Sequence, residues 1–332
     1  MSIPEEYIAI RERVGIADLS HDGHYLISGE DRTSFLQNLI SNDVRLATGN
    51  KGIYSTLLTA KGKIIADFYL YSLAESYLLT MKSVVAEKTF EHLMRFRLRS
   101  KIDIVNPPWG KILVSGPKAR PLLQKLFQKL FNGALPEMEE PSAVVAPMLC
   151  VRQPHTGEAS YYLYCRKDMQ AGIWTELLSL GEQFGVATVG ISTLETVRIE
   201  AGIPQYGVDL TEEIIPIEAG LEGCAISYTK GCYPGQEVVA RIKTYGHVNR
   251  HRVGLILNGR EAPSGGEKIF FDNVEVGWIT AGTFYPFLNK PIATAYLKTS
   301  VAIVGANVVV PLAGQPVLAT VTNLPFYQSV TA

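Results

Sequence analysis

One cysteine lies in a turn that is rich in glycine and proline and close to a lysine. The stretch KGCYPGQEVVAR at 230–241 contains Cys232, and Lys230 stands two residues before it. A thiolate is the reactive form of cysteine, and a neighbouring cation lowers the pKa of the thiol. The stretch therefore predicts a thiol that can ligate iron, carry a persulfide or form a mixed disulfide. The alternative is a small residue packed at a hinge.

The remaining cysteines indicate neither a metal site nor a disulfide framework. The chain has four cysteines, with no C-x-x-C pair and no histidine at a zinc-binding spacing. The sequence therefore predicts no metal site, and disulfides are not expected in a reducing compartment. Cys150 and Cys165 lie in the apolar runs APMLCV and YYLYCR, so we expect both to be buried as small hydrophobic residues.

Two carboxylates stand in apolar surroundings. Asp67 interrupts the strand-like run IIADFYLY, and Glu200 closes the helical run LETVRIEAG. A carboxylate in such a setting needs hydrogen-bond donors, which come either from the protein or from a ligand. The pattern alone leaves two alternatives open: a ligand-binding group, or a carboxylate satisfied by the backbone or by Arg198.

Composition and missing motifs exclude several classes of function. The chain has 332 residues, a net charge of −1 and 47% hydrophobic residues, which indicates a globular protein with no general attraction to nucleic acid or anionic membranes. It has no phosphate-binding loop, dinucleotide fingerprint, nucleophile elbow or H-E-x-x-H motif. The N-terminus does not read as a signal peptide, and the uncharged stretch after Lys298 is divided by glycine and proline into short strands. We therefore expect a cytoplasmic protein without a membrane span.

An internal repeat predicts two similar lobes. The segments LISGEDRTSFLQNL (26–39) and LVSGPKARPLLQKL (113–126) match at six of fourteen positions, and each reads as strand, glycine turn and helix. A hairpin and a second helix follow each copy, with the helices expected near 83–96 and 168–180. This order favours two ferredoxin-like α+β lobes. The basic run RFRLRSK at 95–101 alternates charged with apolar residues and predicts the entrance to a strand.

The chain divides near residue 250. Short strand patterns separated by glycine, proline and asparagine follow this point and predict a small C-terminal β-barrel or sandwich. We therefore expect an α+β region of two interleaved lobes over 1–245 and a β-barrel domain over 250–332.

Several motifs together resemble a known superfamily. ADLSHDGHYLISG, LISNDV, GIYSTLLTAKGKIIADFYLY, ETVRIEAGIPQYGVDL and IEAGL (217–221), in this order, resemble the aminomethyltransferase superfamily of the glycine cleavage T-protein. Within it, KGCYPGQEVVARI followed by GHVNR is similar to the signature of the YgfZ group, which are folate-binding proteins of iron–sulfur cluster maintenance. The resemblance implies two ferredoxin-like lobes and a C-terminal barrel in a three-domain ring, with tetrahydrofolate or a derivative bound at its centre.

The resemblance also implies site residues. Asp67 matches the T-protein active-site aspartate, Tyr54 matches a tyrosine that lines the folate cleft, and Glu200 matches the pterin-binding glutamate. The basic run that begins at Arg241 could bind the glutamate tail of folate or RNA phosphates. A solvated linker before the barrel explains the run equally well.

The chain departs from the T-protein pattern where chemistry is at stake. The T-protein stretch R-T-G-Y-T-G-E is replaced by RQPHTGE at 152–158, and Cys232 stands just before YPGQ, which replaces an aromatic-x-Gly-basic segment. These changes predict an aminomethyltransferase-like fold that keeps the folate cleft and loses T-protein activity.

Three functional hypotheses follow. The first is a folate-binding accessory protein that serves iron–sulfur client or carrier proteins, including tRNA-modifying enzymes, through Cys232. The alternative is a tetrahydrofolate-dependent aminomethyltransferase or demethylating enzyme that depends on Asp67. Direct RNA binding is the weakest of the three, because no aromatic platform accompanies the basic runs.

Overall fold

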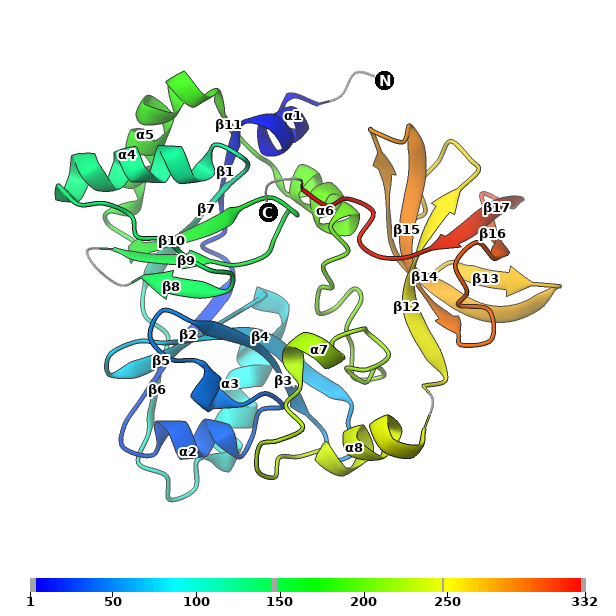
Figure 1. Ribbon diagram of the computed structural model, residues 1–332, viewed down its shortest axis with the longest axis horizontal. Helices are drawn as coiled ribbons and strands as arrows, with labels where there is room; N and C mark the ends of the chain where they lie inside the picture. Colours follow the sequence, from blue (N-terminus) through cyan, green and yellow to red (C-terminus); the bar gives the residue numbers. More distant parts are fainter. Residues whose placement is uncertain (1–3, 145–147, 247, 330–332) are drawn as a thin grey trace.

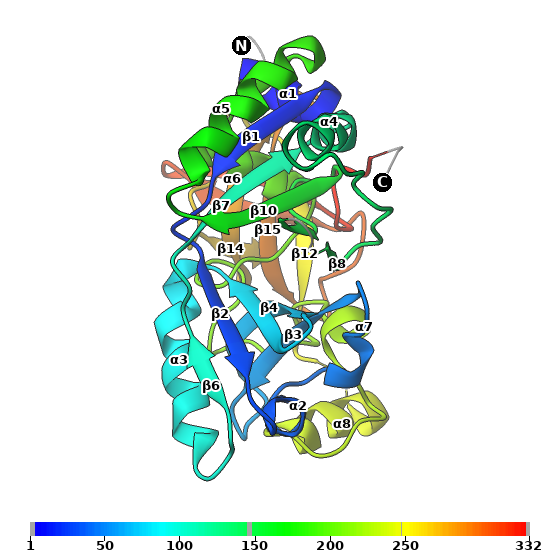
Figure 2. The ribbon, with the colours of Figure 1, turned by 90° about the vertical axis from the view of Figure 1, so that its left-hand side faces the viewer.

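The described residues form three sheets with helices packed on or between them. The computed structural model describes residues 4–144, 148–246 and 248–329, and Figure 1 shows its two α+β lobes beside a separate β-domain. Figure 2 shows the two lobes one above the other, with the five-stranded sheet below the six-stranded sheet. The residue of the GHVNR motif at position 247 lies outside the described residues.

The first lobe is a five-stranded sheet with two helices. Its strands are arranged in the order β3-β4-β5-β2-β6. The elements are β2 (Gly23–Ser28), α2 (Arg32–Gln37), η1 (Val44–Leu46), β3 (Gly52–Leu58), β4 (Ile64–Ser72), β5 (Ser76–Met81), α3 (Ser83–Arg97) and β6 (Asp103–Val105). Apolar residues at helical spacing, such as Val85 and Leu93 of α3, pack with Leu79 of β5 in one core.

The second lobe is a six-stranded sheet that contains the first strand of the chain. Its strands are arranged in the order β11-β1-β7-β10-β9-β8. The elements are α1 (Glu5–Glu12), β1 (Val14–Asp18), β7 (Trp109–Ser115), α4 (Ala119–Phe131), β8 (Ser142–Val144), β9 (Leu149–Arg152), β10 (Ser160–Arg166), α5 (Gln170–Gly181), η2 (Glu182–Phe184) and β11 (Val186–Thr188). Because β1 pairs with β7 and β11, the chain enters this lobe, builds the first lobe and then returns.

Helices and loops connect the lobes to a closed barrel. The connecting elements are α6 (Ile191–Glu200), α7 (Glu222–Ala225) and α8 (Gln236–Tyr245). The barrel strands are β12 (Arg250–Leu257), β13 (Lys268–Phe271), β14 (Val274–Tyr285), β15 (Lys290–Lys298), β16 (Asn307–Leu312) and β17 (Gln315–Thr322). They close in the order β12-β15-β14-β13-β16-β17, so no open sheet edge remains to pair with another chain.

The internal repeat corresponds to equivalent units of the two lobes. β2 leads through Gly29 into α2, and β7 leads through Gly116 into α4. Both glycines have positive φ angles, 104° and 128°, and a Cβ at either position would lie within 3 Å of a backbone oxygen. Glycine is therefore required at both turns by conformation and by space. The predicted fold class, two α+β lobes and a C-terminal β-barrel, is confirmed.

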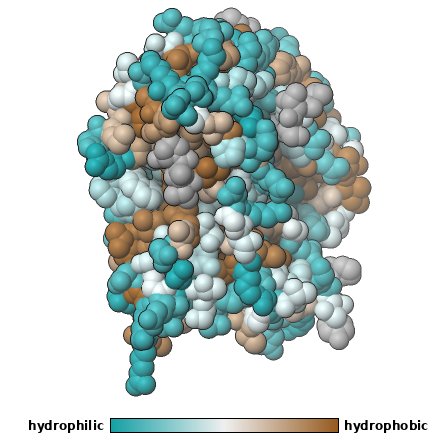
Figure 3. Space-filling view, turned by 60° about the vertical axis from the view of Figure 1, so that its left-hand side comes forward, coloured by the Kyte–Doolittle hydropathy of each residue, from teal (hydrophilic) through white to brown (hydrophobic). Residues whose placement is uncertain are grey.

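Local predictions agree with the structure in most places and fail in one. The helices expected near 83–96 and 168–180 are α3 and α5, and Cys150 and Cys165 are buried. The run at 95–101 is not a strand entrance, because α3 continues to Arg97 and β6 begins only at Asp103. No helix within the described ranges is long and apolar enough to cross a membrane. On the face in Figure 3, apolar residues lie in separate patches among polar ones.

Candidate active site

A large cavity lies where the lobes, the connecting segment and the end of the barrel meet. Its volume is about 1100 Å³. Its walls come from β3, β4 and the end of β5, from the loop before β10, from the segments 201–205 and 219–229, and from residues 323–325 after β17. A cavity of this size accommodates a ligand larger than most metabolites, because ligand pockets commonly measure about 300–1,000 Å³.

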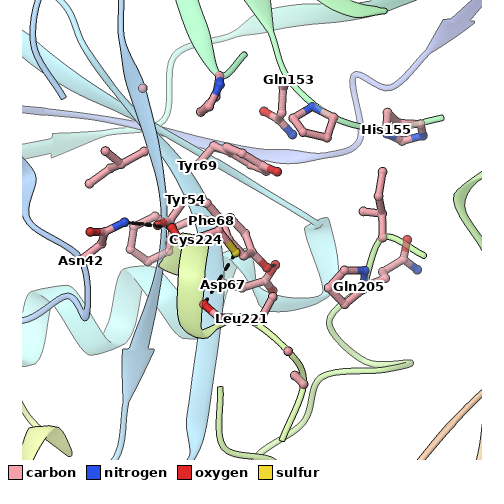
Figure 4. Close-up of a pocket in the computed structure, with 18 of the residues that line it drawn as sticks. Asn42, Tyr54, Asp67, Phe68, Tyr69, Gln153, His155, Gln205, Leu221 and Cys224 are labelled. Carbon is pink, nitrogen blue, oxygen red and sulfur yellow. Dashed lines mark hydrogen bonds between the residues drawn. The ribbon is translucent and has the colours of Figure 1, made fainter. Parts of the chain in front are cut away.

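Two neighbouring strands place a carboxylate and a phenol on the same wall of this cavity. Thr56 of β3 pairs with Asp67 of β4, and Tyr54 pairs with Tyr69. Side chains two residues apart on a strand share a face, so Tyr54 and Asp67 are diagonal neighbours. The Tyr54 hydroxyl donates a hydrogen bond of 2.7 Å to Asp67 Oδ2, and Figure 4 shows both side chains beside Tyr69 in the cavity.

Asp67 has no cationic partner within hydrogen-bonding distance in the described structure. Removal from water raises the pKa of its carboxyl group to about 6, and the Tyr54 hydrogen bond acts against this shift. Burial also raises the pKa of Tyr54 well above its usual value, so its hydroxyl stays protonated and donates. A carboxyl group with a pKa near 6 exchanges a proton readily near neutral pH, which suits a general acid or base.

A thiol that the sequence analysis did not single out also lines the cavity. Cys224 belongs to the short helix α7, lies beside Tyr54 and Asp67 in Figure 4, and donates to the Leu221 carbonyl oxygen at 3.6 Å. Desolvation raises the pKa of its thiol, so the neutral form is favoured. A four-residue helix shows no periodicity from which the direction of the Cys224 side chain could be predicted. The neighbouring motif IEAGL was the one feature of the sequence that pointed to this segment.

Glu200 does not reach the cavity, which corrects the position expected for it. Its side chain is completely buried at the end of α6 and is paired with Arg11 of α1. The Tyr7 hydroxyl donates a further hydrogen bond of 3.0 Å to the same carboxylate oxygen. Burial raises the pKa of Glu200, and the bonds from Arg11 and Tyr7 oppose this shift. Its partners are therefore Arg11 and Tyr7 rather than Arg198, which instead pairs with Glu195 and Asp209, and the second oxygen of Glu200, Oε1, has no hydrogen-bond partner in the described structure.

Cys232 is exposed, as expected for a turn thiol, whereas the ammonium group of Lys230 is buried against the first lobe. Cys232 lies in the loop before α8 and outside the cavity lining. The Lys230 ammonium is buried and donates to the carbonyl oxygens of Ile40 at 2.5 Å and Asn42 at 3.0 Å. Burial lowers its pKa to about 8. Lys230 therefore fastens this loop to the first lobe, and an effect of its charge on the Cys232 thiol stays a prediction.

The basic run after Cys232 does not form one patch on the cavity. Arg241 is exposed on α8 and does not line the cavity, so its expected contact with folate lacks structural support. Arg250 is held by Glu218, with Nε and Oε1 3.0 Å apart. Arg252 reaches the cavity wall, and its guanidinium also bonds the Gly202 carbonyl oxygen at 2.8 Å. Within the described ranges no group of three or more His, Cys, Asp or Glu side chains is arranged to hold a metal ion.

Comparisons with known proteins give one consistent result. The GCVT N-terminal domain model matches residues 1–230, and the glycine cleavage T-protein C-terminal barrel domain model matches 250–328. An aminomethyltransferase of Caldanaerobacter subterraneus subsp. tengcongensis is 30% identical over 98% of this chain and 88% of its own length. An aminomethyltransferase of Geobacillus sp. (strain WCH70) is 33% identical over 98% of this chain and 91% of its own length.

A solved structure matches the whole fold. The glycine cleavage system aminomethyltransferase T from Bartonella henselae superposes with a TM-score of 0.89 at 24% identity, over 98% of this chain and 89% of that chain. The arrangement of two lobes and a barrel is therefore that of the T-protein fold.

Proposed function

Because this chain belongs to the aminomethyltransferase family, we propose that it transfers a one-carbon unit between an aminomethyl donor and tetrahydrofolate in the central cavity. The observation that carries the proposal is the Asp67 carboxylate, which faces the cavity, has no cationic partner in the part of the chain that the structure describes, and accepts a hydrogen bond from Tyr54. In this site tetrahydrofolate is a substrate.

The chemistry of such a transfer matches the position of Asp67. When an amine nitrogen of tetrahydrofolate attacks the one-carbon centre, a new C–N bond forms as the bond between that carbon and the donor breaks. The departing donor group takes the electron pair of the broken bond and a proton, while the attacking nitrogen gains positive charge and must then lose a proton. A carboxylate beside that nitrogen stabilises the charge and accepts the proton. The Tyr54 hydrogen bond fixes one oxygen of Asp67 and leaves the other free for the substrate amine.

The cavity supports a ligand of this kind. Its volume of about 1100 Å³ suits a molecule with a fused ring system and an extended tail. Aromatic side chains line it near Asp67, among them Tyr54, Phe68 and Tyr69, and offer apolar faces to a flat ring.

Calorimetric titration with tetrahydrofolate tests this proposal. We expect saturable one-to-one binding to the wild-type protein and weaker binding to Asp67→Asn by about tenfold, the order of one lost charge-assisted hydrogen bond. Glu137→Gln is a suitable control, because Glu137 is an exposed residue outside the cavity lining. An absence of binding to wild type at millimolar tetrahydrofolate would contradict the proposal.

A second candidate function rests on the exposure of Cys232. A folate-binding protein that supports iron–sulfur client or carrier proteins needs an accessible thiol, and Cys232 is exposed in the loop that carries the YgfZ-like motif. The two candidates can be separated in a strain that lacks the protein. Each variant is expressed in this strain, and the activity of the strain's iron–sulfur enzymes is measured. Loss of rescue in Cys232→Ser, with rescue retained in Asp67→Asn, supports this second function. The reverse result supports transfer at Asp67.

A further inference from the structure

Another part of the cavity holds a polar cluster that the proposed reaction at Asp67 does not use. Its members all line the cavity and come from both lobes: Asp22, Lys82, Lys111, His155 and Tyr162. The first two adjoin β2 and α3 of the first lobe, and the others belong to β7, the loop before β10, and β10. The cluster therefore lies where the two sheets meet.

Charge is unbalanced within this cluster. The Lys111 ammonium lies 2.9 Å from Asp22 Oδ2, and both side chains are almost completely buried. The Lys82 ammonium forms an ion pair of 3.7 Å with the other oxygen of Asp22, Oδ1, which is too long for a hydrogen bond, and that oxygen has no hydrogen-bond partner within the described structure. Because Lys111 already pairs with the single carboxylate, Lys82 keeps donors that are free for a ligand. Its side chain is 31% exposed.

His155 presents a second free donor. It is only 8% exposed, and its Nδ1 lies 2.6 Å from the Tyr162 hydroxyl oxygen. Burial, together with the charges of Lys82 and Lys111, holds the pKa of His155 well below its usual value, so the ring is neutral. When Tyr162 donates to Nδ1, the ring proton lies on Nε2. Within the described structure Nε2 has no partner, and His155 lines the cavity.

The start of helix α3 adds a third positive element. Lys82 is the N-cap residue of this fifteen-residue helix, whose first turn contains no acidic residue and whose N-cap side chain makes no capping hydrogen bond. The N-terminal end of a helix carries a partial positive charge and backbone N–H groups without partners. The helix end, the Lys82 ammonium and the His155 ring therefore favour an anionic oxygen in the same part of the cavity.

We propose that this part of the cavity binds a carboxylate group of the ligand, with Lys82 and His155 as donors. The inference names a subsite within the proposed function and rests on it for the reacting group at Asp67. Lys82 also lies close enough to Asp67 to influence the titration of its carboxyl group. Two ligands can supply the carboxylate: the glutamate tail of tetrahydrofolate, or a small amino acid whose amine lies at Asp67.

Calorimetry on the full chain with four probes tests the subsite and separates these sources. The first pair is tetrahydrofolate and the amide of tetrahydropteroic acid, which lacks the glutamate and its carboxylates. The second pair is glycine and glycinamide, which lacks only the carboxylate. Each is titrated into wild type, Lys82→Gln, Lys82→Arg and the control Lys61→Gln, a substitution at an exposed lysine in the turn before β4. Thermal unfolding checks that each variant is folded.

The results expected differ between the sources. If the folate tail occupies the subsite, Lys82→Gln lowers the affinity for tetrahydrofolate at least about tenfold and leaves the affinity for the amide of tetrahydropteroic acid unchanged. If an amino acid occupies the subsite, Lys82→Gln lowers the affinity for glycine to the same extent and leaves the affinity for glycinamide unchanged. Lys82→Arg, which keeps the charge, retains part of the affinity in either case.

Two further outcomes would count against the proposals separately. Carboxylate-bearing probes that bind Lys82→Gln as tightly as Lys61→Gln would overturn the subsite, even with tetrahydrofolate bound normally. Tetrahydrofolate that fails to bind wild type would overturn the proposed function. The glycine pair would then still decide on the subsite, because that comparison needs no folate, and a failure of glycine to bind would overturn the subsite as well.

Discussion

Asp67 and Glu200 look alike in the sequence and differ in the structure. Each is an isolated carboxylate in an apolar run, and the family resemblance implied a ligand contact for both. Glu200 is completely buried and paired with Arg11 and Tyr7, whereas Asp67 lines the cavity, accepts from the neutral phenol of Tyr54 and pairs with no cation among the described residues. A buried carboxylate with a guanidinium partner stabilises the packing of helices. A carboxylate that lines a cavity and has no cationic partner can bind a substrate or exchange a proton with it.

The largest effect is expected on turnover in Asp67→Asn. The substitution keeps the size of the side chain and a hydrogen-bond acceptor for Tyr54 but removes the proton acceptor. We expect the rate of one-carbon transfer to tetrahydrofolate to fall at least about 100-fold, the range for loss of a general base. Measurement of kcat with purified protein checks this. A variant with wild-type kcat would remove the distinction between the two carboxylates.

Glu200→Gln should act on stability. The substitution removes the closer carboxylate partner of the buried Arg11 guanidinium and leaves Glu158 at 3.8 Å, and breaking a buried pair by removing one side costs about 3–5 kcal/mol. We expect the free energy of unfolding in urea to fall by this amount. The matched control is Glu137→Gln, which removes an exposed partner of Arg120 and should cost less than about 1 kcal/mol. Equal effects in the two variants would show that the buried Glu200 pair contributes no more to the free energy of unfolding than an exposed pair.

The pH dependence of stability offers a sharper comparison at Asp67. The pKa of its carboxyl group is about 6 in the folded protein and 3.8 in the reference state, so folding favours the protonated form. Its contribution to stability is therefore present below about pH 4 and is lost as the pH rises through 6.

Asp67→Asn lacks this dependence. We expect its free energy of unfolding, relative to wild type, to be about 2 kcal/mol higher at pH 7 than at pH 4, somewhat less than the full shift because the carboxyl group contacts solvent in the cavity. Urea unfolding at both values measures the difference. An identical pH profile for the two proteins would mean that the carboxyl group is not desolvated.

The smallest effect on folding is expected at Cys232. Its side chain is exposed in the loop before α8, so Cys232→Ser should change the free energy of unfolding by no more than about 1 kcal/mol. Cys150→Ser is the contrasting variant, because Cys150 is fully buried in the core of the second lobe. Denaturant unfolding compares the two. A larger loss in Cys232→Ser than in Cys150→Ser would show that the loop thiol is a packing residue.

Local patterns predicted most of the fold, and the family resemblance predicted one wall of the site. The glycine turns at Gly29 and Gly116 marked equivalent units, and the resemblance named Tyr54 and Asp67, which the structure places on strands that pair. These features depend on residues close in sequence or on adjacent strands. The run at 95–101 misled because charged and apolar residues also alternate over the last turn of a helix and the loop after it.

Long-range packing set the remainder of the site. Glu200 meets Arg11 only because α1 and α6 pack together, and 189 residues separate the pair. Lys230 stands two residues from Cys232 in sequence, yet its ammonium bonds carbonyl groups of the first lobe. No local periodicity reports such contacts, so neither the pairing of Glu200 nor the burial of Lys230 could be predicted from the sequence.

The most direct test of the role of Asp67 is its titration by carbon-13 NMR, with and without tetrahydrofolate. Labelled aspartate, with Asp67→Asn to assign the signal, reports the carboxyl carbon itself. We expect a pKa near 6 in the free protein and a change in the chemical shift when tetrahydrofolate binds. A carboxyl group that titrates near the ordinary aspartate value of about 3.9 and does not respond to tetrahydrofolate would contradict it.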